Sequence, residues 1–476
     1  MKSNRILTAL LLPLLLATPA WSRVFLSWTQ PDVPPVEILA VDGLAIPWGP
    51  HYEDIAKRAR QLGYLVYLEA SLEQAQAAAA AAQQPSALML DPGSATQAEA
   101  EKVAATLRRQ HPGLSVLLVD RGAKEPQMRG HSIVTRNGVL ETSSPTEQPW
   151  LDCNLALVRY DRVIRPQQAP LYQFDWELDE PLRQQQGPTA ADYVLAAAEA
   201  GAFHADVILS VRDDLQTRLA HGDAGALAFW NRIKPYLQFA RRAPEASRPE
   251  ADVGLVPDAD YNWFEPANLM ARHNIPFRVL PADQIGSSLH GLEVLVVFAS
   301  PGKDAAAAIQ RFASEGGAAV LAGITGAYPW HALKPAQTSS RLATYDVGQG
   351  QIIELLQPVD DPDTFAADIR RLLDQRSPMI SLWNALTTIA VPYRTANPDE
   401  LELELVNYSQ DPLPVQVRVK GEFRSIRYET PENGCCRALK PHFESGSTQF
   451  VVPGLPTAGR IYLAAHSGAA APASRP

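Results

Sequence analysis

The stretch PLYQFDWELDE, residues 170–180, begins as an apolar and aromatic run and carries four carboxylates in its last six residues. Such a run predicts a buried strand that delivers acidic side chains and a tryptophan to its C-terminal end. In a β/α barrel, the C-terminal ends of the strands form the face that carries the functional site. The stretch therefore predicts a barrel strand with candidate site residues at the barrel mouth.

Short apolar runs and helical segments alternate on the N-terminal side of this stretch and continue after it. This pattern is typical of parallel strands that are buried on both faces. Besides the opening stretch, we predict strands at residues 38–41, 64–68, 87–90, 114–119 and 206–211, with a further one at 24–28. About seven strand–helix units result, close to the eight of a closed barrel. Residues 23–242 are therefore predicted to form a TIM-type α/β barrel, either complete or degenerate.

The rest of the chain predicts two further domains. Residues 243–251 read as a linker by their proline and alanine content. Residues 252–376 again alternate strands and helices, which predicts a doubly wound, flavodoxin-like α/β domain. Residues 377–465 contain strictly alternating strands with short turns, which predicts an antiparallel β-sandwich. The alanine-, proline- and serine-rich residues 466–476 are predicted to be disordered.

The N-terminus has the pattern of a secretory signal. Lys2 and Arg5 precede an apolar segment, residues 6–17, that is too short to span a bilayer. Small residues at positions 20 and 22 predict cleavage after Ser22, so we expect a secreted or periplasmic bacterial protein with no membrane span after signal removal. An uncleaved N-terminal anchor is the alternative.

Charge and cysteine content exclude several classes of protein. The net charge of −10 argues against nucleic-acid binding, which needs a basic surface. Three cysteines, Cys153, Cys435 and Cys436, are too few for a disulfide-stabilised fold. We predict Cys435 and Cys436 to be unpaired thiols, with a ring disulfide between them as the alternative. No cysteine or histidine spacing indicates a metal site, and no cofactor is expected.

The order of the predicted domains resembles that of bacterial β-galactosidases whose middle domain is similar to class I glutamine amidotransferases. The segment WFEPANLMARHNIPF, residues 263–277, resembles the first helix and second strand of that middle domain. The resemblance implies hydrolysis of a glycosidic bond in a poly- or oligosaccharide, and homo-oligomers through the middle domain. No cysteine lies between Cys153 and Cys435, so no thiol nucleophile of the amidotransferase type can be present there.

The barrel departs from this family where activity would be decided. The family is expected to place an Asn-Glu acid after the fourth strand and a glutamate nucleophile after the seventh. Here the corresponding segments, residues 119–121 and 210–214, contain no glutamate. A catalytically inactive carbohydrate-binding or assembly protein on the same scaffold is therefore the alternative function.

Four carboxylates are the candidate catalytic residues: Glu177, Asp175, Asp152 and Asp120. Glycoside hydrolysis needs one protonated and one ionised carboxyl group, which face each other across the bond. Asp175 and Glu177 are two residues apart, so on a strand they would point to the same side. Each candidate has a structural alternative, because charge runs are usually surface, and aspartates at element ends often cap helices or form turns.

Five residues are candidates for substrate binding: Trp150, Asn154, Trp176, Asp42 and Trp48. Trp150 and Asn154 lie around an irregular loop before a predicted helix. Trp176 could stack on a sugar or face the barrel helices. Asp42 would end a predicted strand on the functional face, and Trp48 follows it. Aromatic residues of this kind also pack under loops.

Overall fold

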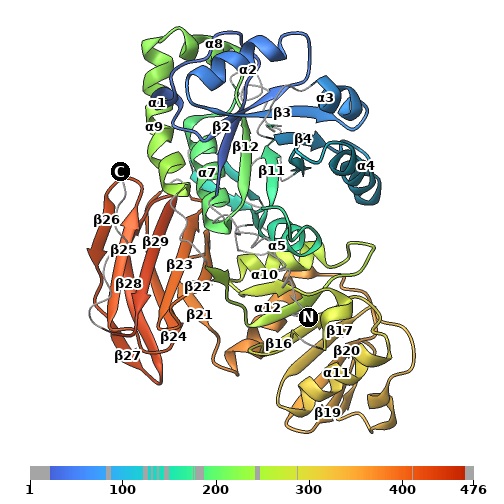
Figure 1. Cartoon of the computed structure of the whole chain (residues 1–476). Coiled ribbons are helices and arrows are strands. Elements are labelled where there is room, and N and C mark those ends of the chain that lie inside the picture. The colour runs from blue at the N-terminus through green and yellow to red at the C-terminus, as the bar shows by residue number, and fades with distance from the viewer. Residues whose placement is uncertain are drawn as a thin grey trace, which may run out of the picture.

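The structure is a computed structural model, and it describes residues 22–81, 87–121, 127–129, 132–136, 139–143, 150–174, 176, 187–241, 247–286, 288–409 and 411–466. Residues 1–21, most of the predicted signal peptide, and residues 467–476, most of the predicted tail, lie outside these ranges. Figure 1 shows the N-terminal barrel in blue and green, the α/β region in yellow and the antiparallel sheets in red. Among the described residues, no helix has the length and apolar character needed to cross a membrane.

A parallel sheet that nearly closes on itself forms the N-terminal half of the protein. Its strands are β1 (Val24–Ser27), β2 (Gly43–Pro47), β3 (Leu65–Ser71), β4 (Ala87–Asp91), β5 (Val116–Leu118), β6 (Asp120–Arg121), β11 (Leu171–Phe174) and β12 (Asp206–Ser210). Their order is β5-β4-β3-β2-β1-β12-β11-β6. Because β5 and β6 are consecutive parts of one stretch of chain, which pairs with β4 and then with β11, the sheet forms a seven-stranded barrel. The predicted TIM-type barrel is confirmed in this form.

Helices cover the outside of the barrel, which is why its strands are apolar on both faces. These helices are α1 (Val36–Leu39), α2 (Tyr52–Gln61), α3 (Ala75–Ala81), α4 (Gln97–Gln110), α5 (Leu155–Ile164), α7 (Ala190–Phe203), α8 (Asp213–Ala220) and α9 (Ala224–Ala240). One set of alternating strand residues, which includes Phe25, Tyr67 and Ile208, forms a small core inside the barrel. The other set joins the larger core under the helices.

The predicted strand at residues 38–41 is wrong. Residues 36–39 form the short helix α1, and the strand β2 begins only at Gly43. A side chain at Gly43 would place its Cβ 2.7 Å from the carbonyl oxygen of Leu65, so a glycine allows β2 to lie close against β3. As a consequence, Asp42 precedes a strand instead of ending one.

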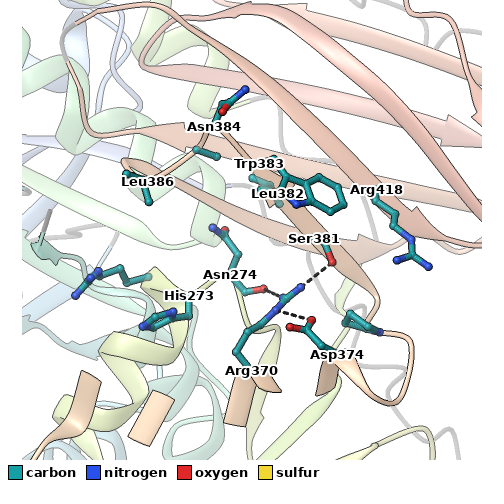
Figure 2. Close-up of a pocket in the computed structure, with 13 residues that line it drawn as sticks. His273, Asn274, Arg370, Asp374, Ser381, Leu382, Trp383, Asn384, Leu386 and Arg418 are labelled. Carbon is teal, nitrogen blue, oxygen red and sulfur yellow. Dashed lines mark hydrogen bonds and ion pairs between the residues drawn. The ribbon is translucent and has the colours of Figure 1, made fainter. Parts of the chain in front are cut away.

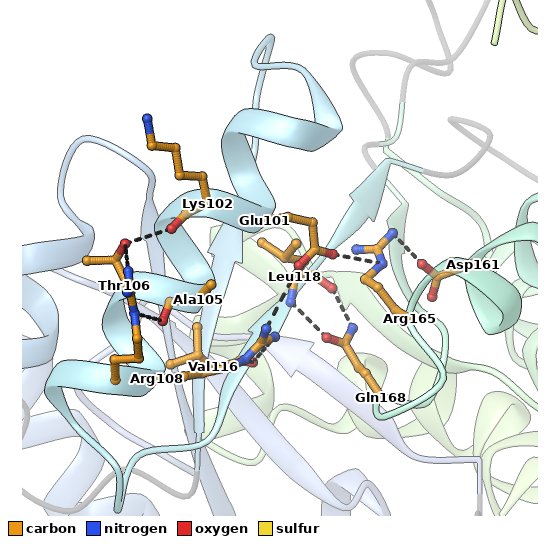
Figure 3. Close-up of polar contacts among 11 residues, drawn as sticks. Glu101, Lys102, Ala105, Thr106, Arg108, Val116, Leu118, Asp161, Arg165 and Gln168 are labelled. Atoms are coloured by element: carbon orange, nitrogen blue, oxygen red, sulfur yellow. Dashed lines mark hydrogen bonds and ion pairs between the residues drawn. The ribbon is translucent and has the colours of Figure 1, made fainter.

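Side chains complete the hydrogen bonding where the barrel is open, as Figure 3 shows. β5 pairs with β4 on one side and has no strand on its other side among the described residues. The side chain of Gln168 donates to the Leu118 carbonyl at 2.7 Å and accepts from the Leu118 amide at 3.0 Å. Arg108 donates to the Val116 carbonyl at 2.9 Å. The edge of β5 is thus satisfied without a neighbouring strand.

An insertion between β6 and α5 adds two small pairs of strands: β7 (Gln127–Arg129) with β10 (Trp150–Asp152), and β8 (Ser132–Arg136) with β9 (Val139–Ser143). β8 and β9 pair antiparallel, from Ser132 opposite Ser143 to Arg136 opposite Val139. The structure describes the backbone of these strands, not their side chains.

A second, mixed sheet follows the barrel, with strands β14 (Val253–Val256), β15 (Phe277–Val279), β16 (Val294–Val297), β17 (Ala318–Ala322), β18 (Gln337–Thr338), β19 (Leu342–Val347) and β20 (Gly350–Leu355). Its order is β15-β14-β16-β17-β20-β19-β18, and the first five strands are parallel. Three helices flank it: α10 (Phe264–Arg272), α11 (Lys303–Ser314) and α12 (Pro362–Asp374). The core under α10 and α12 is continuous with the barrel core, whereas α11 covers a separate one.

Two antiparallel sheets form the C-terminal region and share one core. The first contains β13 (Arg248–Pro249), β22 (Thr388–Arg394), β23 (Glu400–Asn407), β25 (Ser425–Thr430), β26 (Gly434–Ala438) and β29 (Ala458–Ala464). The second contains β21 (Ile380–Trp383), β24 (Leu413–Lys420), β27 (His442–Glu444) and β28 (Ser447–Leu455). Cys435 and Cys436 on β26 are joined in a disulfide, so the prediction of two unpaired thiols is wrong.

Candidate functional site

The inside of the barrel changes from apolar to polar at the C-terminal ends of its strands. Tyr67 of β3 and Ile208 of β12 face the interior core. Two residues further along these strands, Glu69 and Ser210 face the same way, because successive strand residues alternate between the two faces. Both are half-buried. The barrel mouth therefore presents a carboxylate and a hydroxyl.

Glu69 is a site residue that the sequence analysis missed. The backbone carbonyl of Glu69 accepts a hydrogen bond from the Trp48 amide at 2.7 Å, which links the C-terminal end of β3 to the loop after β2. The predicted strand stopped at Leu68, and β3 continues through Ser71. An acid that directly follows a predicted barrel strand is the same signal that selected Asp120, so Glu69 could have been found from the sequence.

Asp91 stands on the neighbouring strand and already has a structural role. In the ladder, Glu69 lies opposite Met89 and Ser71 lies opposite Asp91. Strand spacing and rise then put the Cα atoms of Glu69 and Asp91 roughly 8 Å apart. An Asp91 carboxylate oxygen accepts from the Gly93 amide at 2.9 Å, the geometry of an aspartate that forms a turn.

The wall beside Ser210 is built by hydrogen bonds from β11 and α7. The Gln173 side chain donates to the Ser210 hydroxyl at 3.2 Å. The Ser210 carbonyl accepts from the indole N–H of Trp176 at 2.9 Å and from the hydroxyl of Tyr193 at 3.0 Å. The Trp176 ring stacks on Phe174 and meets Tyr193 edge to face, with centroids 5.4 and 5.1 Å away. Of the two roles considered for Trp176, the structure shows packing against the barrel helices.

Most of the predicted acids cannot be placed by their side chains. Asp175 and Glu177 lie outside the described residues. Asp120 is in β6, opposite Tyr172 of β11, and Asp152 is in β10 next to Trp150. The structure does not describe the side chains of Asp120, Trp150 and Asp152, so the roles of these residues stay predictions.

Asn154 belongs to a buried network instead of an open cleft. It is 3% exposed, and its side-chain amide donates to Glu199 of α7 at 2.6 Å. Glu199 is fully buried and also accepts from the hydroxyl groups of Tyr172 and Tyr408. This network ties the N-terminus of α5 to the barrel and to the C-terminal sheets.

Asp42 lies at the opposite end of the barrel from the mouth, so its expected place on the functional face is wrong. Its carboxylate accepts from the amide of Val24, at the start of β1, and pairs with Arg241 at 2.8 Å. Burial raises the pKa of Asp42, and Arg241 opposes this shift. Residues at the N-terminal end of such barrels serve stability. Trp48, in contrast, directly follows β2 at the mouth, half-buried against Tyr52.

Two groups of described residues have ligand atoms close enough to hold a metal ion. The first is His204 with Glu402 and Glu404, but Arg460 pairs with both glutamates at 3.3 and 2.5 Å, so a protein cation already occupies the position next to their oxygens. The second is Glu429 with Cys435 and Cys436, whose sulfur atoms are bonded to each other. Neither group lies at the barrel mouth.

No protein-family model and no curated protein matches the chain. Among solved structures, the chain is similar to α-L-fucosidase isoenzyme 2 from Paenibacillus thiaminolyticus, with 12% identity and a TM-score of 0.59, over 94% of this chain and 100% of the other. A β-galactosidase from Bacillus circulans sp. alkalophilus has 11% identity and a TM-score of 0.40, over 87% and 66% of the two chains. The exo-β-1,4-mannosidase Op5Man5 from Opitutaceae bacterium strain TAV5 has 11% identity and a TM-score of 0.46, over 75% and 95%.

The fold assignment rests on the fucosidase, because the other two TM-scores are below 0.5. The chain has a glycoside-hydrolase-like fold. This agrees with the family resemblance at the level of architecture. The likeness of the middle sheet to glutamine amidotransferases stays a prediction.

Proposed function

We propose that this protein hydrolyses a glycosidic bond in a poly- or oligosaccharide at the mouth of its barrel. The observation that carries the proposal is Glu69, an interior-facing carboxylate at the C-terminal end of β3 in a barrel of glycoside-hydrolase-like fold. In barrel enzymes this face supplies the catalytic groups. Trp48, after β2, donates its backbone amide to the Glu69 carbonyl, and its ring packs against Tyr52.

The second carboxylate of the pair would come from Asp175, Glu177, Asp152 or Asp120. Asp120 ends β6, and Asp175 and Glu177 follow β11 in the sequence, so these three belong to barrel segments, whereas Asp152 ends β10, which pairs with β7 outside the barrel sheet. A pair whose carboxyl groups lie about 5–5.5 Å apart would retain the anomeric configuration, and one about 6.5–9.5 Å apart would invert it. The stereochemistry of the product would therefore report how far the partner carboxyl group lies from Glu69.

The alternative function is a catalytically inactive protein that binds carbohydrate or takes part in an assembly. Two described aspartates at or just after the ends of barrel strands, Asp213 and Asp91, favour this alternative, because their carboxylates already accept hydrogen bonds within the protein. Asp213, after β12, accepts from the Thr29 hydroxyl at 2.7 Å and lies in the first turn of α8. Asp91 accepts from a turn amide, as described above. Both aspartates therefore have structural roles.

Cell location and assembly belong to the same proposal. Export to the periplasm or beyond follows from the signal-like N-terminus, and a polysaccharide substrate would be met there. Homo-oligomers through the middle domain follow from the family resemblance.

The test is hydrolysis of aryl α-L-fucosides, β-D-galactosides and β-D-mannosides, and of oligosaccharides, by the purified protein. Glu69→Gln is compared with Glu177→Gln and Asp152→Asn. Loss of a catalytic carboxyl group should lower kcat/KM by roughly 10²–10⁴-fold while the melting temperature stays unchanged. Glu73→Gln, at an exposed position shortly after β3, is the matched control.

Three outcomes separate the hypotheses. Activity that Glu69→Gln abolishes and Glu73→Gln preserves would establish Glu69 as catalytic. Activity that survives Glu69→Gln would remove Glu69 from the mechanism. A wild-type protein that binds oligosaccharides without cleaving any of them would favour the binding function.

A further inference from the structure

A cleft of about 570 Å³ lies between the C-terminal sheets and the second α/β region. Figure 2 shows its lining residues, with the side chain of Arg370 directed towards Ser381. No barrel residue lines it among the part of the chain that the structure describes. Its volume is within the range of small-molecule binding sites. This cleft is therefore separate from the barrel mouth.

The sandwich contributes an aromatic wall to this cleft. Ile380 and Leu382 of β21 face the core between the two sheets. Ser381 and Trp383 alternate with them along the strand, so they face outward. Arg418 of β24 lies opposite Ser381 and shares this outer face. Trp383 is 45% exposed and Leu386, in the loop after β21, is 59% exposed. Large apolar side chains that line a cleft and remain exposed are typical of a binding surface.

The charges of the cleft leave one cation without a partner. Arg370 pairs with Asp374 at 3.0 Å and donates to the Ser381 hydroxyl at 2.6 Å. Arg272 pairs with Asp363 at 3.0 Å. Arg418 lines the same cleft, and its guanidinium group makes no hydrogen bond or ion pair with any other described residue. Asp374 is the one carboxylate among the described lining residues, against three arginines.

We propose that this cleft binds an acidic saccharide, such as a uronic-acid oligosaccharide, with a sugar ring on Trp383 and its carboxylate on Arg418. A guanidinium group matches a carboxylate through two parallel hydrogen bonds, which is more specific than a point charge. An exposed indole offers a flat apolar face with a polar edge, which suits the C–H face of a pyranose ring. The net charge of the whole chain is −10, so a locally cationic cleft would select an anionic ligand against the general repulsion of the surface.

The test is isothermal titration calorimetry of the full-length protein with trigalacturonic acid and, as the neutral counterpart, maltotriose. We expect saturable binding of the acidic trisaccharide with one site in this cleft, weakened by added salt, and much weaker binding of maltotriose. Arg418→Gln should weaken binding of trigalacturonic acid by about tenfold or more, because it removes a charge-assisted pair. Trp383→Ala should also weaken it, through loss of the stacking face.

Two exposed residues of the same sandwich provide matched controls: Arg424→Gln for the charge and Phe443→Ala for the aromatic ring. Both controls should bind like the wild type. Absence of binding, equal binding of the neutral sugar, or equal affinities of Arg418→Gln and Arg424→Gln would each overturn the proposal. These outcomes are independent of whether the barrel hydrolyses any glycoside, because the variants and the readout differ from those that test Glu69.

Discussion

At the scale of single residues, His204 is held uncharged by its surroundings. It ends α7 in the left-handed conformation, with φ of 54°, and its ring stacks on Tyr393 at 3.8 Å. Burial lowers the pKa of His204 to about 4, and the nearby Glu404, 3.9 Å away, opposes this shift without reversing it. Arg162 and Arg460 lower the pKa further. The folded protein therefore excludes a proton that the unfolded chain accepts below its ordinary pKa of about 6.5.

This shift predicts a loss of stability in mild acid. The contribution of His204 is fully present above about pH 6.5 and is lost as the pH falls towards 4, by up to about 3 kcal/mol. In His204→Asn, which tolerates the left-handed backbone, the free energy of unfolding should fall less between pH 7 and pH 4.5 than in the wild type. Urea unfolding at several pH values measures it. Burial raises the pKa of Asp252 to about 6, so this residue increases the free energy of unfolding as the pH falls. Its effect is the same in the wild type and in the variant, so it cancels in the comparison. Parallel pH curves would contradict the prediction.

At the scale of elements, the side chain of Gln168 makes hydrogen bonds to the edge of β5 that a neighbouring strand would otherwise make. Its side chain makes two hydrogen bonds to Leu118, which is 1% exposed. Gln168→Ala would leave a buried amide and a buried carbonyl without these partners, which costs about 1–3 kcal/mol. The free energy of unfolding in urea should fall by this amount, whereas Gln61→Ala, at an exposed position in α2, should leave it nearly unchanged. Equal stability of the two variants would show that water or a neighbouring group replaces Gln168.

The elements also show what the sequence can and cannot predict here. Strands such as β3 and β12 are recognisable because each is a short apolar run between two helical segments. The sequence misplaces β2 because Asp42-Gly43 is typical of a turn after a strand, whereas the glycine opens the strand in close contact with β3. That contact is tertiary, and no local pattern contains it. The same error moves Asp42 to the wrong end of the barrel, whereas Glu69 lies one residue beyond the predicted end of β3, which is three residues too early.

At the scale of the whole molecule, the regions are joined through buried contacts. One core runs from the barrel through α10 and α12 of the second region to Tyr393 and Tyr408 of the C-terminal sheets. Beside it, Arg460 of β29 lies over the ring of Phe239 in α9, with 4.7 Å between the guanidinium carbon and the ring centroid. A continuous core of this kind predicts that the barrel and the sheets unfold together.

Arg460 offers a test of this coupling because it is fully buried with two glutamates. Burial alone would raise the pKa of Glu404, but the guanidinium of Arg460, together with His204 and a hydrogen bond from Glu402, holds this pKa below its usual value. Burial raises the pKa of Glu402, so Arg460→Met chiefly leaves the buried carboxylate of Glu404 without its cation, which should destabilise the protein by about 3–5 kcal/mol. Calorimetry should show one transition shifted to lower temperature, and adding Glu402→Gln and Glu404→Gln should restore part of the loss. If the sheets melted in a separate early transition while the barrel kept its wild-type melting temperature, the two regions would be independent, and the shared core would contribute little to the stability of either.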